Sequence, residues 1–148
     1  MTASIWRKNS TPPWACRPGS GTGLRPLILT GDGGFQMTGV EIAHALRYKL
    51  NPIVVLLNNG GWGIFRPIAK RQDLLALPSW RYADLARLWG GRGFQVETVA
   101  QLRRSLDEAA KSSSFAIIEV MTGSEDLSPI TLKYIRASAK KAQINSQA

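Results

Sequence analysis

The 148-residue chain is 44% hydrophobic, which is enough for one domain with a buried core and too little for several. Its net charge of +9 comes from dispersed Lys and Arg, without a basic and aromatic stripe, a helix-turn-helix or a zinc-ligand spacing, which argues against a nucleic-acid partner. A single cysteine, Cys16, excludes an intrachain disulfide, and no apolar stretch reaches the roughly 18 residues of a membrane span, so we expect a cytoplasmic protein that uses no membrane.

Residues 1–23 are the first segment, and they fit no regular element. They contain three prolines, two tryptophans, no acidic residue and neither helical nor strand periodicity, which predicts an irregular conformation. One hypothesis is that a reading-frame disruption upstream of Leu24 produced this segment instead of native sequence. An intact frame encoding it in independent isolates would contradict that hypothesis.

Residues 24–123 are the predicted domain, which opens with a strand, a helix and a second strand. The apolar runs 27–30 and 53–57 are typical of buried strands. Between them, Thr38 and Glu41 match a capping box, and the apolar spacing that follows predicts a helix over 42–49. A crossover of this kind makes the two strands parallel, so the loops that leave them emerge at the same edge of the sheet.

The same alternation continues through the rest of the domain. Residues 66–79 are expected to form a loop or a short helix. After them come a helix over 82–89, a strand over 94–97, a helix opened by a second capping box at Thr98 and Gln101, and a strand over 115–120. This order predicts a doubly wound α/β fold, a parallel sheet with helices on both faces. Residues 124–148 are expected to be a tail that is partly helical or disordered.

Polar residues follow each of the first two predicted strands directly. Gly31-Asp32-Gly33-Gly34 comes after the first, and Asn58-Asn59-Gly60-Gly61 comes after the second. Open α/β sheets bind ligands at this edge, where glycines let backbone amides approach phosphate oxygens. We therefore expect Asp32 and Asn59 to meet and to hold a Mg²⁺ ion that carries a diphosphate. Taken singly, either motif is better explained as an ordinary turn.

The complete spaced set resembles the cofactor-binding signature of thiamine diphosphate-dependent enzymes over roughly residues 24–121. Within that family it is most similar to 2-oxo acid decarboxylases that act on phenylpyruvate or indolepyruvate. The stretches 31–39 and 58–62 carry most of this resemblance. It implies thiamine diphosphate and Mg²⁺ as cofactors and a 2-oxo acid as the small-molecule substrate, which is decarboxylated to an aldehyde.

The resemblance also implies a role for particular residues. The metal ligands would be the Asp32 carboxylate, the Asn59 side-chain oxygen and the Gly61 main-chain oxygen. Backbone amides at Gly33 and Gly34 would meet the diphosphate. The full set of implied cofactor-binding residues is Gly31, Asp32, Gly33, Gly34, Asn59, Gly61 and Ile64.

Ile64 and Phe65 occupy positions where the family's substrate-facing residues lie. In pyruvate decarboxylases the second position resembles a glutamate used in proton transfer, and a phenyl ring cannot relay a proton, so this departure counts against a pyruvate decarboxylase. Together with Trp62, the two residues predict an apolar pocket for an aromatic 2-oxo acid. Core packing explains Trp62 and Phe65 equally well. Equal turnover of pyruvate and phenylpyruvate by a full-length relative would contradict the pocket hypothesis.

One catalytic part of the family is missing from this chain. The glutamate that activates the cofactor lies on a pyrimidine-binding domain, which normally comes from a neighbouring subunit of a homo-oligomer. The resemblance therefore implies a fragment that needs such a domain from a separate or missing chain, and no catalytic residue can be assigned. Two alternatives stay open, an acetolactate synthase-like carboligase domain and a non-catalytic cofactor-binding or interaction remnant.

Overall fold

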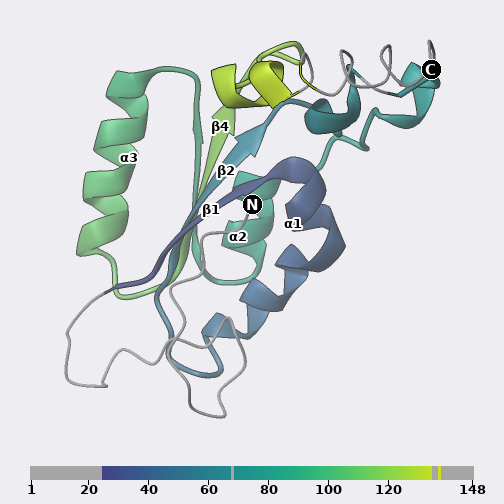
Figure 1. The fold of residues 1–148 in the computed structure, drawn as a ribbon. Helices are drawn as coiled ribbons and strands as arrows, with labels where there is room; N and C mark the ends of the chain where they lie inside the picture. Colours follow the sequence, from purple (N-terminus) through teal and green to yellow (C-terminus); the bar gives the residue numbers. More distant parts are fainter. Residues whose placement is uncertain (1–24, 68, 135–136, 138–148) are drawn as a thin grey trace, which may run out of the picture.

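The computed structural model describes residues 25–67, 69–134 and 137, so the predictions for residues 1–23 and most of the tail lie outside the described residues. Its centre is a parallel four-stranded sheet in the order β1-β2-β4-β3 (Figure 1). The strands are β1 Leu27–Gly31, β2 Ile53–Asn58, β3 Arg92–Val96 and β4 Ala116–Met121. The predicted parallel α/β sheet is confirmed. No helix within the described ranges is long and apolar enough to cross a membrane.

Helices cover both faces of the sheet. On one face lies α3, while α1 and α2 lie on the other (Figure 1). The helices are α1 Asp32–Thr38, α2 Tyr82–Leu88 and α3 Val99–Lys111, with 3₁₀ turns η1 Gly39–Ala45, η2 Gly63–Phe65 and η3 Gln72–Leu74. The second predicted capping box is confirmed, because the Thr98 hydroxyl accepts from the Gln101 amide and the Gln101 side chain accepts from the Thr98 amide. In the predicted tail, residues 129–134 are helical.

The first predicted capping box is wrong. Thr38 is the last residue of α1, and its side chain makes no capping hydrogen bond. The helix begins directly after β1, because Gly31 is extended and Asp32 already enters the first helical turn. Gly33 and Gly34 concealed this start, since glycine disfavours helix interiors. The Gly-Asp-Gly-Gly motif is therefore a helix N-terminus at the sheet edge instead of a loop.

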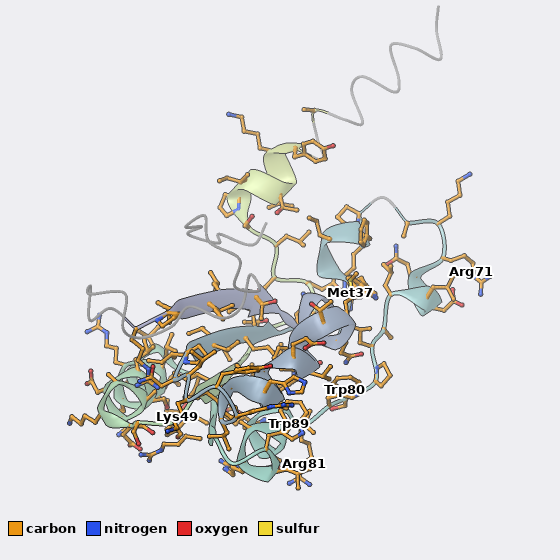
Figure 2. All side chains as sticks on the ribbon, turned by 90° about the horizontal axis from the view of Figure 1, so that it is seen from below. Met37, Lys49, Arg71, Trp80, Arg81 and Trp89 are labelled. Atoms are coloured by element: carbon orange, nitrogen blue, oxygen red, sulfur yellow. The ribbon has the colours of Figure 1, made fainter. Side chains whose placement is uncertain are left out.

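Two apolar clusters hold the layers together. The larger one packs α1, η1 and α2 against the sheet and includes Phe115, Ile117 and Tyr82. Trp80 and Trp89, which lie just before and just after α2, pack against this cluster (Figure 2). The smaller one packs α3 against β3 and β4. On the face that α3 covers, no described helix lies over β1, so Leu27 and Leu29 are 62% and 59% exposed.

Arg25 joins the start of β1 to the end of α3. Its guanidinium donates to the carbonyl oxygens of Ser112 at 2.9 Å and Ser114 at 2.7 Å, and also to those of Ala109 and Asn51. The last carbonyls of a helix lack partners within the helix, so a planar, multiply donating cation is well suited to this position. Burial lowers the pKa of Arg25 from its ordinary value, but an arginine stays charged at neutral pH.

Arg25→Gln is expected to lower the free energy of unfolding by about 2 kcal/mol, because carbonyls at the end of α3 lose a charged donor. Urea denaturation followed by circular dichroism measures this loss. The matched control is Arg103→Gln, since Arg103 lies on the exposed side of α3. Equal stability of the two variants would show that the guanidinium does not cap the helix.

Candidate functional site

The site lies at the edge of the sheet where β1, β2 and β4 end. An open cavity of about 290 Å³ occupies this edge. The loop 77–79, which precedes α2, forms its opposite wall. The strand ends contribute Asp32, Asn58, Asn59, Gly60, Met121 and Thr122. Two of the predicted site residues, Asp32 and Asn59, therefore line one cavity.

Asp32 is held by two backbone amides. It is 3% exposed, and its Oδ1 accepts from the Gly33 amide at 2.8 Å while its Oδ2 accepts from the Gly61 amide at 2.9 Å. The two bonds fix the carboxylate in one orientation and join the ends of β1 and β2. Because each carboxylate oxygen has two lone pairs and uses one for an amide, each still has a lone pair that can bind a further ligand.

Asn59 faces the same amide as Asp32. Its Oδ1 lies 3.3 Å from the Gly61 nitrogen, which also donates to Asp32. The structure thus brings a carboxylate oxygen and a carboxamide oxygen together around one backbone group, as the crossover geometry predicts. The Gly61 carbonyl oxygen accepts from the Gly63 amide at 2.9 Å across a tight turn at Trp62, and its second lone pair is left for another ligand.

Close packing explains two of the site's glycines. A Cβ added at Gly33 would lie 2.8 Å from the ring of Trp62, and one added at Gly63 would lie 2.3 Å from the Asn59 side-chain nitrogen. A larger residue at either position would displace a side chain that shapes the site. Gly31 ends β1 and caps α1, and Gly34 follows Gly33 in the first helical turn.

The residues of the predicted apolar pocket follow the second strand end. Trp62 packs over Gly33, and its ring centroid is 6.2 Å from that of Phe65. Ile64 and Phe65 lie in η2 and are 62% and 47% exposed. The cavity at the sheet edge is lined by other residues. A substrate-facing role for Trp62, Ile64 and Phe65 therefore stays a prediction.

Buried Tyr82 anchors the opposite wall of the cavity. The Gln36 side chain donates to the Tyr82 hydroxyl at 2.8 Å and to the Pro78 carbonyl at 2.9 Å, which ties α1 to the loop 77–79. Burial raises the pKa of Tyr82, the hydrogen bond from Gln36 opposes this, and the charges of Asp32 and Glu119 add to it. The hydroxyl is therefore neutral at physiological pH. Neither Gln36 nor Tyr82 was predicted as a site residue, because their separation of 46 residues along the chain leaves no local signal.

A second polar pair was also missed. Asn58 donates to the buried carboxylate of Glu119 at 2.8 Å. Glu119 stands within the apolar run of the last strand, at residues 115–120. A charged residue inside a fully buried strand is uncommon unless it is paired, and this was the signal that could have identified Glu119.

The donor set restricts which cation the site can hold. Among the residues that the structure describes, no group of three or more His, Cys, Asp or Glu side chains could hold a metal ion. One carboxylate with amide and carbonyl oxygens is a hard, incomplete ligand set. Mg²⁺ suits such a set, because it commonly takes one or two protein groups and completes its octahedron with phosphates and water.

The chain is similar in sequence to known proteins. Residues 20–120 match the family described as thiamine pyrophosphate enzyme, C-terminal TPP binding domain. Indole-3-pyruvate decarboxylase of Azospirillum brasilense is 37% identical over 119 residues, which are 80% of this chain and 22% of that protein. A probable acetolactate synthase of Mycobacterium bovis is 32% identical over 101 residues, which are 65% of this chain and 18% of that protein.

A solved structure has a similar fold. The benzoylformate decarboxylase of Polynucleobacter necessarius superposes with a TM-score of 0.62 at 27% identity, covering 71% of this chain and 21% of that one. The chain therefore spans about a fifth of the length of the proteins that it matches.

Asp32→Asn is expected to lower the free energy of unfolding by about 2 kcal/mol, because its new NH₂ group must face the Gly33 or the Gly61 amide, donor against donor. Urea denaturation measures the loss, and faster hydrogen exchange at the Gly33 or Gly61 amide locates it. The control is Asp73→Asn. Asp73 pairs with Arg71 at 2.5 Å on an exposed loop that projects away from the sheet (Figure 2), and exposed pairs contribute little. Equal losses in both variants would contradict the role of Asp32 at the strand ends.

Proposed function

This chain belongs to the thiamine pyrophosphate enzyme family through its C-terminal TPP-binding domain, and we propose that it binds thiamine diphosphate together with Mg²⁺ at the carboxyl edge of its sheet. The observation that carries the proposal is the meeting of the Asp32 and Asn59 oxygens around the Gly61 amide, beside an open cavity. Both are hard oxygen donors, which Mg²⁺ prefers.

In this proposal the ion is held by Asp32, by the Asn59 side chain and by the Gly61 carbonyl. The start of α1 supports a place for the diphosphate, since Gly31 and Gly34 are exposed and carry no side chain at the positive end of a helix. Gly33 is buried under Trp62, and its amide donates to Asp32. Ile64, just beyond the metal-binding turn, is assigned to the cofactor. When bound, thiamine diphosphate supplies the electron sink that lets the bond between a keto carbon and its carboxylate break.

The proposed substrate is an aromatic 2-oxo acid such as phenylpyruvate or indolepyruvate, and the reaction is its non-oxidative decarboxylation in the cytoplasm. The likeness to two decarboxylases supports the reaction type. The apolar side chains of Trp62, Ile64 and Phe65 beside the site support an aromatic substrate. The likeness to an acetolactate synthase supports the alternative of a carboligase.

The proposal includes a partner. The chain spans about a fifth of the length of its relatives, and the pyrimidine-binding domain that bears the activating glutamate is proposed to lie outside residues 1–148, within a homo-oligomer in the full-length family. Exposed apolar residues close to the site support this requirement. Ile64 is 62%, Phe65 47% and Leu74 66% exposed. A non-catalytic cofactor-binding or interaction remnant is the alternative if no such partner exists.

Thiamine diphosphate is expected to bind only when Mg²⁺ is present, and Asp32→Ala is expected to weaken binding at least about tenfold by removing the charged ligand. Quenching of tryptophan fluorescence reports the binding, since Trp62 packs against Gly33 at the site. Asp73→Ala is the control, since its side chain is exposed and pairs with Arg71. Binding that survives both EDTA and Asp32→Ala would refute the proposed ion site.

Decarboxylation is expected only when a separately produced pyrimidine-binding domain of a relative is added to the loaded chain. Phenylpyruvate should then react faster than pyruvate, because Phe65 offers an apolar surface and no proton-transfer group. Aldehyde as the product supports a decarboxylase, whereas an acetohydroxy acid supports the carboligase. Cofactor binding without turnover, both in the absence and in the presence of the added domain, would favour the non-catalytic alternative.

A further inference from the structure

Glu119 is a buried carboxylate that forms no ion pair with any residue the structure describes. It lies within β4, next to Leu56 of β2 and Gln95 of β3, and is 3% exposed. None of the ion pairs formed by the described residues includes it. Since a buried charge is costly unless hydrogen bonds compensate it, the partners of this carboxylate indicate what it does.

The two oxygens of Glu119 bind donors from two other elements. Oε1 accepts from the Asn58 side chain at 2.8 Å, and Oε2 accepts from the backbone amide of Ala83, in the first turn of α2, at 3.1 Å. A carboxylate has two oxygens that only accept, so it can satisfy both donors at once. A glutamine could satisfy only one. The residue thereby joins β4, β2 and α2.

The bond to Glu119 fixes the orientation of the Asn58 carboxamide. Since its nitrogen donates to Glu119, its oxygen is directed to the Gly60 amide, from which it accepts at 3.1 Å. Asn58 is itself held, because its carbonyl accepts from the Thr122 amide at 2.9 Å. The Asn58 side chain therefore bridges Glu119 and the turn of residues 58–61.

This turn carries the candidate ion ligands. Gly60 has a φ of +73°, a left-handed conformation that its hydrogen bond to Asn58 helps to hold. The next amide, of Gly61, donates to Asp32 and contacts the Asn59 oxygen. Glu119 is thus separated from the ligand set by one side chain and one turn.

We propose that Glu119 is a positioning residue for the ion site: by orienting Asn58, it holds the 58–61 turn so that Asn59 and Gly61 face Asp32. The effect of Glu119 on the turn is a property of the ligand-free protein. Its effect on ion and cofactor affinity rests on the proposed function.

A donor and acceptor exchange tests this role. In Glu119→Gln the new NH₂ group faces the donor of either Asn58 or Ala83, so one hydrogen bond is lost. In the double variant Asn58→Asp/Glu119→Gln, the glutamine donates to the new aspartate and accepts from Ala83, while the aspartate accepts from Gly60. The double variant thus keeps the hydrogen bonds that link Ala83, residue 119, residue 58 and Gly60, and it keeps the same net charge. It loses only the weak donation from Asn58 to the Met121 sulfur at 3.8 Å. Glu108→Gln, at an exposed residue of α3, is the control.

Two readouts are measured. Hydrogen exchange at the Gly60 and Gly61 amides is followed by NMR in the ligand-free protein. It is expected to be about tenfold faster in Glu119→Gln, because one buried hydrogen bond is lost. The affinity for thiamine diphosphate with Mg²⁺ is expected to fall about tenfold for the same reason. The double variant should restore both values, and Glu108→Gln should change neither.

The outcomes separate the two proposals. If Glu119→Gln lowers stability but leaves the exchange of Gly60 and Gly61 unchanged, or if a folded double variant restores neither readout, Glu119 does not position the turn. If Glu119→Gln does not fold, the double variant decides alone, and its failure to fold would also overturn the inference. If the unaltered protein binds no thiamine diphosphate, the proposed function fails, and the exchange measurements still test Glu119.

Discussion

The hydrogen bond from the Gly61 amide to the buried Asp32 carboxylate is the interaction on which the site depends. It joins the ends of β1 and β2, and it does so where Asn59 contacts the same amide. The carboxylate also accepts a hydrogen bond from the backbone amide of Gly33, so it is oriented before any ligand binds. Preorganised oxygen donors lose little freedom when a cation binds, and this favours affinity.

The rest of the edge supports this contact through buried polar groups. Glu119 binds the Asn58 side chain, which in turn accepts from the Gly60 amide just beyond the end of β2. Gln36 and Tyr82 fix the opposite wall of the cavity. These groups come from α1, α2, β2 and β4, so the site needs all four of these elements to be in place. At the other end of the sheet, Arg25 secures α3 through carbonyl groups.

Much of this arrangement was predictable from local sequence. Apolar runs such as 53–57 and the capping box at Thr98 specify elements through interactions between near neighbours, and the crossover rule then places Asp32 beside Asn59. The start of α1 was missed because two glycines obscure the helical pattern after Asp32. Contacts between distant residues left no pattern either. Glu119 and Asn58 are 61 positions apart, and the four acceptors of Arg25 are backbone carbonyls, which any residue can provide.

In the proposed site, Asp32, Asn59 and Gly61 converge on one divalent ion. Paramagnetic Mn²⁺, added with thiamine diphosphate in place of Mg²⁺, broadens NMR signals close to the ion. We expect the amide signals of Gly33 and Gly61 and the side-chain signals of Asn59 to broaden first. Broadening that begins instead at the exposed acidic residues Glu125 and Asp126, with the Gly61 signal unaffected, would contradict it.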